Sequence, residues 1–212
     1  MYRHRRGAPL PERTSATLSE AESKAEKALL RTQMRAARRQ HDAQAHIQAS
    51  NAVLTQALAT NLFASGKRVA AYWATGSELS LKPLLALLLA RGVFVYLPRI
   101  AAAGEMHFLR FHGESCLAPS PHGVLSPKVD AFGPIAAHDI DVMLLPLLAF
   151  DSRGARLGQG GGYYDRYLQG ISANKPLRVG VGFHFQALAQ VPHATLDERL
   201  HAAITDQGVF SF

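Results

Sequence analysis

One stretch of the sequence constrains the fold more than any other: residues 141–150 read DVMLLPLLAF and are apolar almost without interruption. A strand with one face in water alternates apolar and polar residues, whereas a continuous apolar run predicts a strand that is buried on both faces. Strands of this kind occur in parallel sheets that helices cover on both sides. The run therefore predicts the central strand of an α/β protein.

Strands and helices are predicted to alternate along the rest of the chain. Further strands are expected at residues 68–73, 93–98, 105–111 and 178–183. Helices are expected at residues 43–63, at 81–92, where Gly92 ends the helix, and at 185–190. This order predicts an α/β fold in three layers, an open and mostly parallel sheet with helices on both faces.

The first helix is predicted over residues 19–40. Ser19 and Glu22, three residues apart, form the capping-box pattern that starts a helix. Two neighbouring stripes follow at helical spacing, an apolar one of Leu29, Leu30, Met34 and Ala37 and a basic one of Lys27, Arg31, Arg35 and Arg38. One side of this helix is therefore expected to pack on the core and the adjacent side to carry cations.

Charge and composition divide the chain into two parts. Residues 1–19 are polar and without periodicity, which predicts a disordered basic extension, and residues 20–212 are expected to form a single domain. Residues 1–41 hold ten Lys and Arg residues against four acids, whereas the remainder holds thirteen against twelve. A folded nucleic-acid surface needs clustered cations with interleaved aromatics. Since the excess charge is N-terminal, no nucleic-acid partner is expected.

Cysteine content and hydropathy indicate the compartment. Cys116 is the one cysteine, so the chain has no intrachain disulfide, which indicates a reducing compartment. The apolar segment 84–90 is too short to span a membrane. No apolar stretch of a secretory signal follows the basic N-terminal residues. We therefore expect a cytoplasmic protein without a membrane partner.

Residues 156–166 read RLGQGGGYYDR, with four glycines in positions 158–162. The stretch follows the predicted buried strand, at the sheet edge where open parallel sheets bind ligands. Exposed backbone N–H groups at a helix start suit phosphate, although no Gly-Lys-Ser/Thr of a Walker loop follows. A mobile turn is the alternative. Arg156 and Asp165 favour phosphate, because a guanidinium binds phosphate oxygens and a carboxylate binds a bridging Mg²⁺.

The segment LLPLLAFDSRGARLGQGGGYYDRYL resembles the C-terminal signature of the 5-formyltetrahydrofolate cyclo-ligases, or methenyltetrahydrofolate synthetases. Further segments resemble the same family in its order and spacing. These are K-x-x-L-R at residues 27–31, YWATGSELSLKPLL, VYLPRI with EMHFLRF, and RVGVGFHFQ with VPHATLDERLHAAIT. The resemblance covers residues 24 to about 206.

The resemblance implies a Rossmann-like fold of NagB/RpiA-like topology and a ligase that forms a cyclic C–N bond. The implied reaction is the ATP- and Mg²⁺-dependent closure of 5-formyltetrahydrofolate to 5,10-methenyltetrahydrofolate, with release of ADP and phosphate. The formyl oxygen would first be phosphorylated to an iminium phosphate, which the neighbouring folate nitrogen attacks. The expected partners are ATP and the folate, with or without a polyglutamyl tail, and the expected state is a monomer.

The resemblance also assigns roles to individual residues. The implied ATP-binding residues are Lys27, Arg31, Arg156, Gly158, Gln159, Gly160, Gly161, Gly162, Tyr163 and Tyr164. The implied folate-binding residues are Trp73, Glu78, Tyr163 and Tyr164. The implied catalytic residues are Arg156, Tyr163 and Asp165, and the implied Mg²⁺ ligands are Asp165 and Asp197.

Simpler explanations compete with some of these roles. Lys27 and Arg31 fit an ordinary basic helix face, Glu78 fits a cap of the following helix, and Trp73 fits a core position. Two other functions also remain open. One is a non-enzymatic nucleotide- or RNA-binding protein that uses the basic first helix. The other is a related ATP-using enzyme with a different acyl or formamide substrate.

The chain departs from the family pattern at a few positions. Ser126 stands where relatives often carry Glu, so no role is assigned to it. Gln159 and Gly161 replace basic residues of some relatives, which makes phosphate binding depend on Arg156 and on the backbone. His201 stands where an acid is common, which leaves Asp197 as the metal ligand of its segment.

Overall fold

The computed structural model describes residues 20–101, 103–120, 123–171, 175–193 and 197–212. The extension predicted at 1–19 and the capping residue Ser19 lie outside these ranges. Within the described residues, no helix is both long enough and apolar enough to cross a membrane.

The core of the fold is a seven-stranded sheet in the order β12-β11-β9-β6-β1-β2-β3. Its strands are β1 (Arg68–Ala70), β2 (Phe94–Ile100), β3 (Met106–Phe111), β6 (Val142–Pro146), β9 (Leu177–Gly182), β11 (Ala202–Thr205) and β12 (Gly208–Ser211). The strands from β11 to β2 pair in parallel, and β3 and β12 add antiparallel edges. The predicted α/β class and mostly parallel sheet are thus confirmed.

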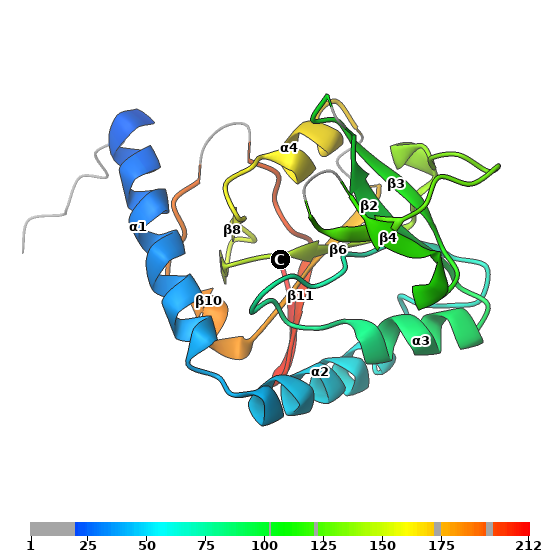
Figure 1. The fold of residues 1–212 in the computed structure, drawn as a ribbon. Helices are drawn as coiled ribbons and strands as arrows, with labels where there is room; N and C mark the ends of the chain where they lie inside the picture. The colour runs from blue at the N-terminus through cyan, green and yellow to red at the C-terminus, as the bar shows by residue number, and fades with distance from the viewer. Residues whose placement is uncertain (1–19, 102, 121–122, 172–174, 194–196) are drawn as a thin grey trace, which may run out of the picture.

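Helices cover both faces of this sheet, as predicted (Figure 1). On one face, α2 (Ala43–Leu58) and α3 (Lys82–Ala90) bury Val53, Leu84 and Leu88 against the sheet. On the other face, α4 (Tyr163–Leu168) packs through Leu168 against Phe108 and its neighbours. The α2 helix is shorter than the predicted 43–63, and β1 is shorter than the predicted 68–73.

A second, smaller sheet supports the N-terminal helix α1 (Glu20–Arg39). It consists of β10 (Ala187–Leu188), β7 (Ala149–Asp151) and β8 (Arg156–Leu157) in that order. Leu30 and Met34 of α1 pack on this sheet. Leu29, predicted for the same apolar stripe, is 61% exposed, so that part of the prediction was wrong. Packed in this way, α1 directs its basic side toward the end of β8.

The single strand predicted at 141–150 is wrong, because the chain leaves the large sheet after Pro146 and enters the small sheet at Ala149. The side-chain amide of Gln186 donates to the carbonyl oxygens of Leu147 and Leu148 at 2.9 and 2.8 Å, which satisfies both where the chain changes sheets. Apart from the partly exposed Pro146, the residues of both strands are buried, so the apolar run shows no interruption.

The same glutamine explains why the helix predicted at 185–190 is also wrong. Its Oε1 accepts from the backbone N–H of Phe183 at 2.8 Å and stabilises a 3₁₀ turn at His184–Gln186. The chain then continues as β10, which pairs with β7. A hairpin that the sequence did not indicate, β4 (Leu117–Pro119) with β5 (Leu125–Pro127), lies beside β2.

Candidate active site

A cavity of about 350 Å³ lies between α1, the segment after β8 and the end of β2. Its size is that of a small-molecule site. Every residue assigned to a site from the sequence lines it: Lys27, Arg31, Trp73, Glu78, Arg156, Gly158, Gln159, Gly160, Gly161, Gly162, Tyr163, Tyr164, Asp165 and Asp197. These residues span 170 positions of the chain, so their convergence is a result of the tertiary fold.

The glycine loop, residues 158–162, requires glycine for its backbone conformation. Gly160 has φ +105° and Gly162 has φ +64°, both in the region that L side chains rarely adopt. Gly162 is also the N-cap of α4, which begins at Tyr163. The loop is therefore a defined turn in this structure, held against its neighbours on both sides.

The basic stripe of α1 holds the glycine loop in place. The Nε of Arg31 donates to the carbonyl oxygen of Gly158 at 3.0 Å. One turn later, Arg35 donates from Nη2 to the carbonyl oxygen of Gln159 at 2.8 Å and from Nε to its side-chain oxygen at 3.3 Å. Lys27 and Arg31 of the predicted stripe thus line the cavity, and Arg31 and Arg35 contact its loop, so this part of the stripe is not an ordinary solvated helix face.

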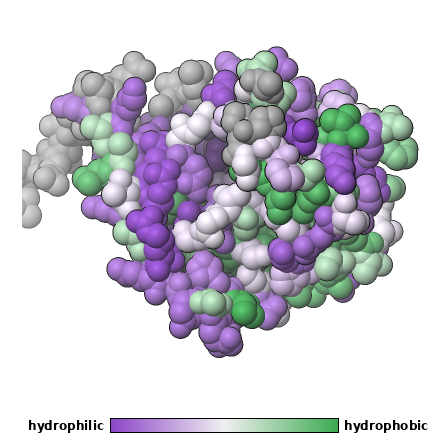
Figure 2. All heavy atoms as spheres, viewed as in Figure 1, coloured by the Kyte–Doolittle hydropathy of each residue, from purple (hydrophilic) through white to green (hydrophobic). Residues whose placement is uncertain are grey.

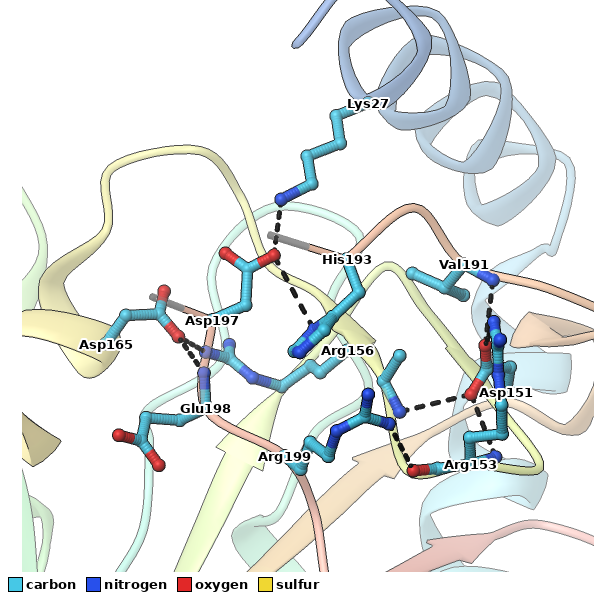
Figure 3. Close-up of polar contacts among 11 residues, drawn as sticks. Lys27, Asp151, Arg153, Arg156, Asp165, Val191, His193, Asp197, Glu198 and Arg199 are labelled. Carbon is cyan, nitrogen blue, oxygen red and sulfur yellow. Dashed lines mark hydrogen bonds and ion pairs between the residues drawn. The ribbon is translucent and has the colours of Figure 1, made fainter. Parts of the chain in front are cut away.

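Arg156 and Asp165, which both line the cavity, form a short ion pair (Figure 3). The Nη2 of Arg156 donates to Oδ1 of Asp165 at 2.7 Å, and the arginine is 7% exposed. Its Nε is buried and has no hydrogen-bond partner within the described part of the chain. A buried guanidinium N–H without a partner is unfavourable, so the Nε of Arg156 keeps hydrogen-bonding capacity beyond the ion pair with Asp165.

Lys27 and Asp197 form a second ion pair at the same cavity and connect α1 to the C-terminal segment (Figure 3). The Nδ1 of His193 lies 3.8 Å from the same carboxylate. Burial lowers the pKa of His193, and Arg199 lowers it further, while Asp197 opposes both. Each predicted metal ligand is thus paired with a predicted phosphate-binding cation.

Glu78 connects two walls of the cavity. Its Oε2 accepts from the backbone N–H and the hydroxyl of Thr75 at 2.9 and 3.1 Å, and its Oε1 accepts from the amide of Gln159 at 2.8 Å. The helix-cap alternative is wrong, because α3 begins after Leu81 without a side-chain cap. Glu78 therefore faces the cavity as an acceptor next to the glycine loop.

The aromatic residues differ in how they meet the cavity. Tyr164 is half-buried and packs near Phe108, and desolvation raises the pKa of its phenol, with the charge of Glu78 adding to the effect. The ring of Tyr163 lies 5.1 Å from the guanidinium of Arg166. Trp73 packs on Phe111 in the core and also lines the cavity, so the core and wall explanations both apply.

The sequence did not indicate the apolar part of the cavity lining. This part, which we call the apolar wall, consists mostly of apolar residues: Pro98, Ile100, Met106, Ser120, Val124, Ser126 and Pro146. Ser126, to which no role was assigned, is buried and accepts from Nη1 of Arg99 at 3.1 Å. A cavity with both apolar and charged lining suits a ligand with a flat organic part and an anionic part.

His201 lies away from the cavity. Its Nδ1 accepts from the backbone N–H of Arg178 at 2.9 Å, which holds the start of β11 beside β9. Within the described residues, no cluster of three or more His, Cys, Asp or Glu residues could hold a metal by itself.

Comparison with known proteins identifies the family of the chain. Residues 23–206 match the model of the 5-formyltetrahydrofolate cyclo-ligase family. The chain is 35% identical over 146 residues to the 5-formyltetrahydrofolate cyclo-ligase of Escherichia coli K12, which is 68% of this chain and 80% of that protein. It is 30% identical over 165 residues to the Haemophilus influenzae protein of the same name, 77% of this chain and 88% of that one.

Solved structures show the same fold. The 5,10-methenyltetrahydrofolate synthetase of Aquifex aeolicus superposes with a TM-score of 0.76 at 29% identity, over 87% of this chain and 92% of that one. The synthetase of Mycoplasma pneumoniae superposes with a TM-score of 0.67 at 21% identity, over 85% and 99%, and supports the fold alone.

Proposed function

This chain belongs to the 5-formyltetrahydrofolate cyclo-ligase family, and we propose that it closes 5-formyltetrahydrofolate to 5,10-methenyltetrahydrofolate with ATP as co-substrate. One observation carries the proposal: the lining of a single cavity brings together cations, a glycine loop, carboxylates and the apolar wall. The charged part of the lining suits a triphosphate, and the apolar wall suits the ring system of a folate.

The chemistry explains why such residues are needed. A formamide oxygen is a poor leaving group, so the proposed first step transfers the γ-phosphoryl group of ATP to the formyl oxygen and releases ADP. The neighbouring folate nitrogen then attacks the formyl carbon of the iminium phosphate and loses its proton, and phosphate leaves with the oxygen. Phosphoryl transfer depends on positioning and charge neutralisation more than on covalent catalysis by the protein.

Lys27, Arg31 and Arg156 are the residues that we assign to the triphosphate. All three are cations on the cavity wall, and the buried Nε of Arg156 lacks a partner among the described residues. The helix α4 is only six residues long, so its dipole is a minor contribution. Backbone N–H groups of Gly158, Gln159 and Gly160–Gly162 would supply the remaining donors.

The carboxylates of Asp165 and Asp197 fit Mg²⁺ in the manner typical of nucleotide sites. Mg²⁺ is usually bound by one or two carboxylates together with substrate phosphates, and both carboxylates line the cavity. When bound, the ion would neutralise phosphate charge. The same two residues hold Arg156 and Lys27 in position, and nucleotide binding would redistribute these contacts between phosphate and metal.

We assign Glu78, Trp73, Tyr163 and Tyr164 to the folate. Glu78 is an acceptor at the boundary between the glycine loop and the apolar wall, where the reacting formyl group would lie. Desolvation raises the pKa of the Tyr164 phenol further above physiological pH, so this neutral hydroxyl is available to donate a hydrogen bond. The two tyrosines follow the glycine loop directly, so both nucleotide and folate would contact them.

The decisive experiment mixes the purified protein with MgATP and 5-formyltetrahydrofolate and follows the absorbance of the methenyl product. We expect product only when the protein, ATP, Mg²⁺ and 5-formyltetrahydrofolate are all present. A folded protein that forms no product would refute the proposal, and product from another formamide alone would favour the related-enzyme alternative. Deleting residues 1–19 tests the RNA-binding alternative. That alternative predicts that RNA affinity is lost with these residues, whereas the proposed catalysis should survive the deletion.

A further inference from the structure

A second depression, which we call the arginine pocket, lies beside the catalytic cavity where α1 meets α2. Its volume is about 590 Å³, and its cationic and imidazole lining residues are Arg35, Arg38, Arg39, His41 and His46. None of the described residues that line it carries a carboxylate. The surface along α1 in Figure 2 is correspondingly hydrophilic.

Arg38 is the residue that makes this pocket more than a charged surface. It is 4% exposed, its buried Nε has no hydrogen-bond partner among the described residues, and it forms no ion pair with any of them. Burial lowers its pKa, which Glu78 partly opposes from the neighbouring cavity. A buried guanidinium without an anion is costly, because its desolvation is not compensated by a partner.

The local structure holds the pocket open and cationic. The ring of His41 stacks on Phe185 with 4.9 Å between the centroids, and the ring of His46 meets Phe183 edge-on at 5.1 Å. Asp42, between the two helices, is occupied as the N-cap of α2 and accepts from the backbone N–H of Ala45 at 2.7 Å. The nearest acid in the sequence therefore does not neutralise the pocket.

Thr75 and Gln159 line both the arginine pocket and the catalytic cavity, so the two are adjoining. We propose that the arginine pocket binds an anionic oxygen group, a carboxylate or a phosphate, beside the catalytic cavity. Two sources have this chemistry, the glutamyl carboxylates of a folate that occupies the cavity and a free anion. The first source rests on the proposed function, and the second does not.

The test compares the full-length wild-type protein with Arg38→Gln, with Arg39→Gln at the exposed end of the pocket, and with the control Arg91→Gln. Arg91 is an exposed arginine outside both cavities, so Arg91→Gln removes the same charge at a position away from the arginine pocket. Two quantities are measured: KM for 5-formyltetrahydrofolate with one or with several glutamyl residues, and the affinity for inorganic phosphate by calorimetry. Circular dichroism and thermal unfolding establish that each variant is folded.

If the anion belongs to the folate, Arg38→Gln raises the folate KM about tenfold, with more effect for longer glutamyl tails and an unchanged KM for ATP. If the pocket binds a free anion instead, Arg38→Gln lowers the affinity for phosphate about tenfold while the folate KM stays constant. Arg39→Gln should show the same change more weakly, and it provides the test if Arg38→Gln does not fold.

The proposal is overturned if folded Arg38→Gln and Arg39→Gln match Arg91→Gln in both measurements. A wild-type protein that turns over no folate would refute the proposed function, and the phosphate titration alone would then decide on the pocket.

Discussion

Arg156 donates to Asp165 at 2.7 Å across the glycine loop, so the cation assigned to phosphate and the carboxylate assigned to the metal bind each other in this structure. The arginine is almost fully buried, whereas the carboxylate is about a quarter exposed to the cavity. The pair therefore orients the guanidinium and leaves part of the carboxylate accessible. Both properties lead to the first prediction.

Removing either partner should abolish most of the activity. We expect Arg156→Gln and Asp165→Asn each to lower kcat at least about 100-fold, because each removes a charge that positions or neutralises the phosphoryl group. Asp165→Asn should also raise the Mg²⁺ concentration needed for half-maximal activity. The measurement is turnover across a Mg²⁺ titration, and Arg91→Gln, at an exposed arginine outside the cavity, is the control. Normal activity of folded Asp165→Asn would contradict its assignment to the metal.

Lys27 should contribute to ATP binding more than to folate binding. We expect Lys27→Met to raise the KM for ATP about tenfold, since a charge-assisted contact is worth about 1.5–3 kcal/mol, while the folate KM changes little. Steady-state kinetics with each substrate varied in turn measure this. Lys24→Met, an exposed lysine of the same helix, is the matched control. Equal changes in both KM values would show that Lys27 only supports the structure.

The glycine loop should not tolerate side chains at its left-handed positions. Gly160→Ala places a Cβ at φ +105° and 3.4 Å from the Nε of Arg31, so we expect a loss of about 1–2 kcal/mol in unfolding free energy and a weaker affinity for ATP. Chemical denaturation and ATP kinetics check both. Gly208→Ala, which meets open space at an ordinary φ, should leave both unchanged. A wild-type-like Gly160→Ala would show that the loop conformation is not required.

Asp151 should make stability depend on pH. Burial alone would raise the pKa of this carboxyl, but hydrogen bonds from Val191, Arg153 and Ala155 outweigh it and leave the pKa below its ordinary value. Its contribution is therefore complete above the unfolded pKa of about 4 and is lost as the pH falls through the lower folded value. We expect Asp151→Asn to lower the unfolding free energy at pH 7 by about 2 kcal/mol.

The difference between wild type and Asp151→Asn should narrow below about pH 4, as measured by denaturation at several pH values. Asp139→Asn removes a carboxylate from an exposed ion pair with Arg68 and should cost less than about 1 kcal/mol. A difference that stays constant from pH 7 to pH 3 would contradict the assignment.

Some of the site could be read from the sequence because it depends on local pattern. The glycines at 160 and 162 are explained by backbone conformation, and the α1 stripe by helical spacing, so both could be recognised without knowing their neighbours. The family resemblance supplied Glu78 and Asp197, which no local pattern distinguishes from other surface acids. The apolar wall was missed because its residues resemble ordinary strand and loop positions.

The sequence by itself determined the class of the fold, since the periodicity of apolar residues reports which faces of an element are buried. Only the tertiary structure decided where the run 141–150 divides, because burial on all sides looks the same in one strand or two. It also decided that Lys27 meets Asp197, 170 residues away, and that Arg38 is buried while Leu29 is exposed. Such partners depend on how distant elements pack together, which local spacing does not report.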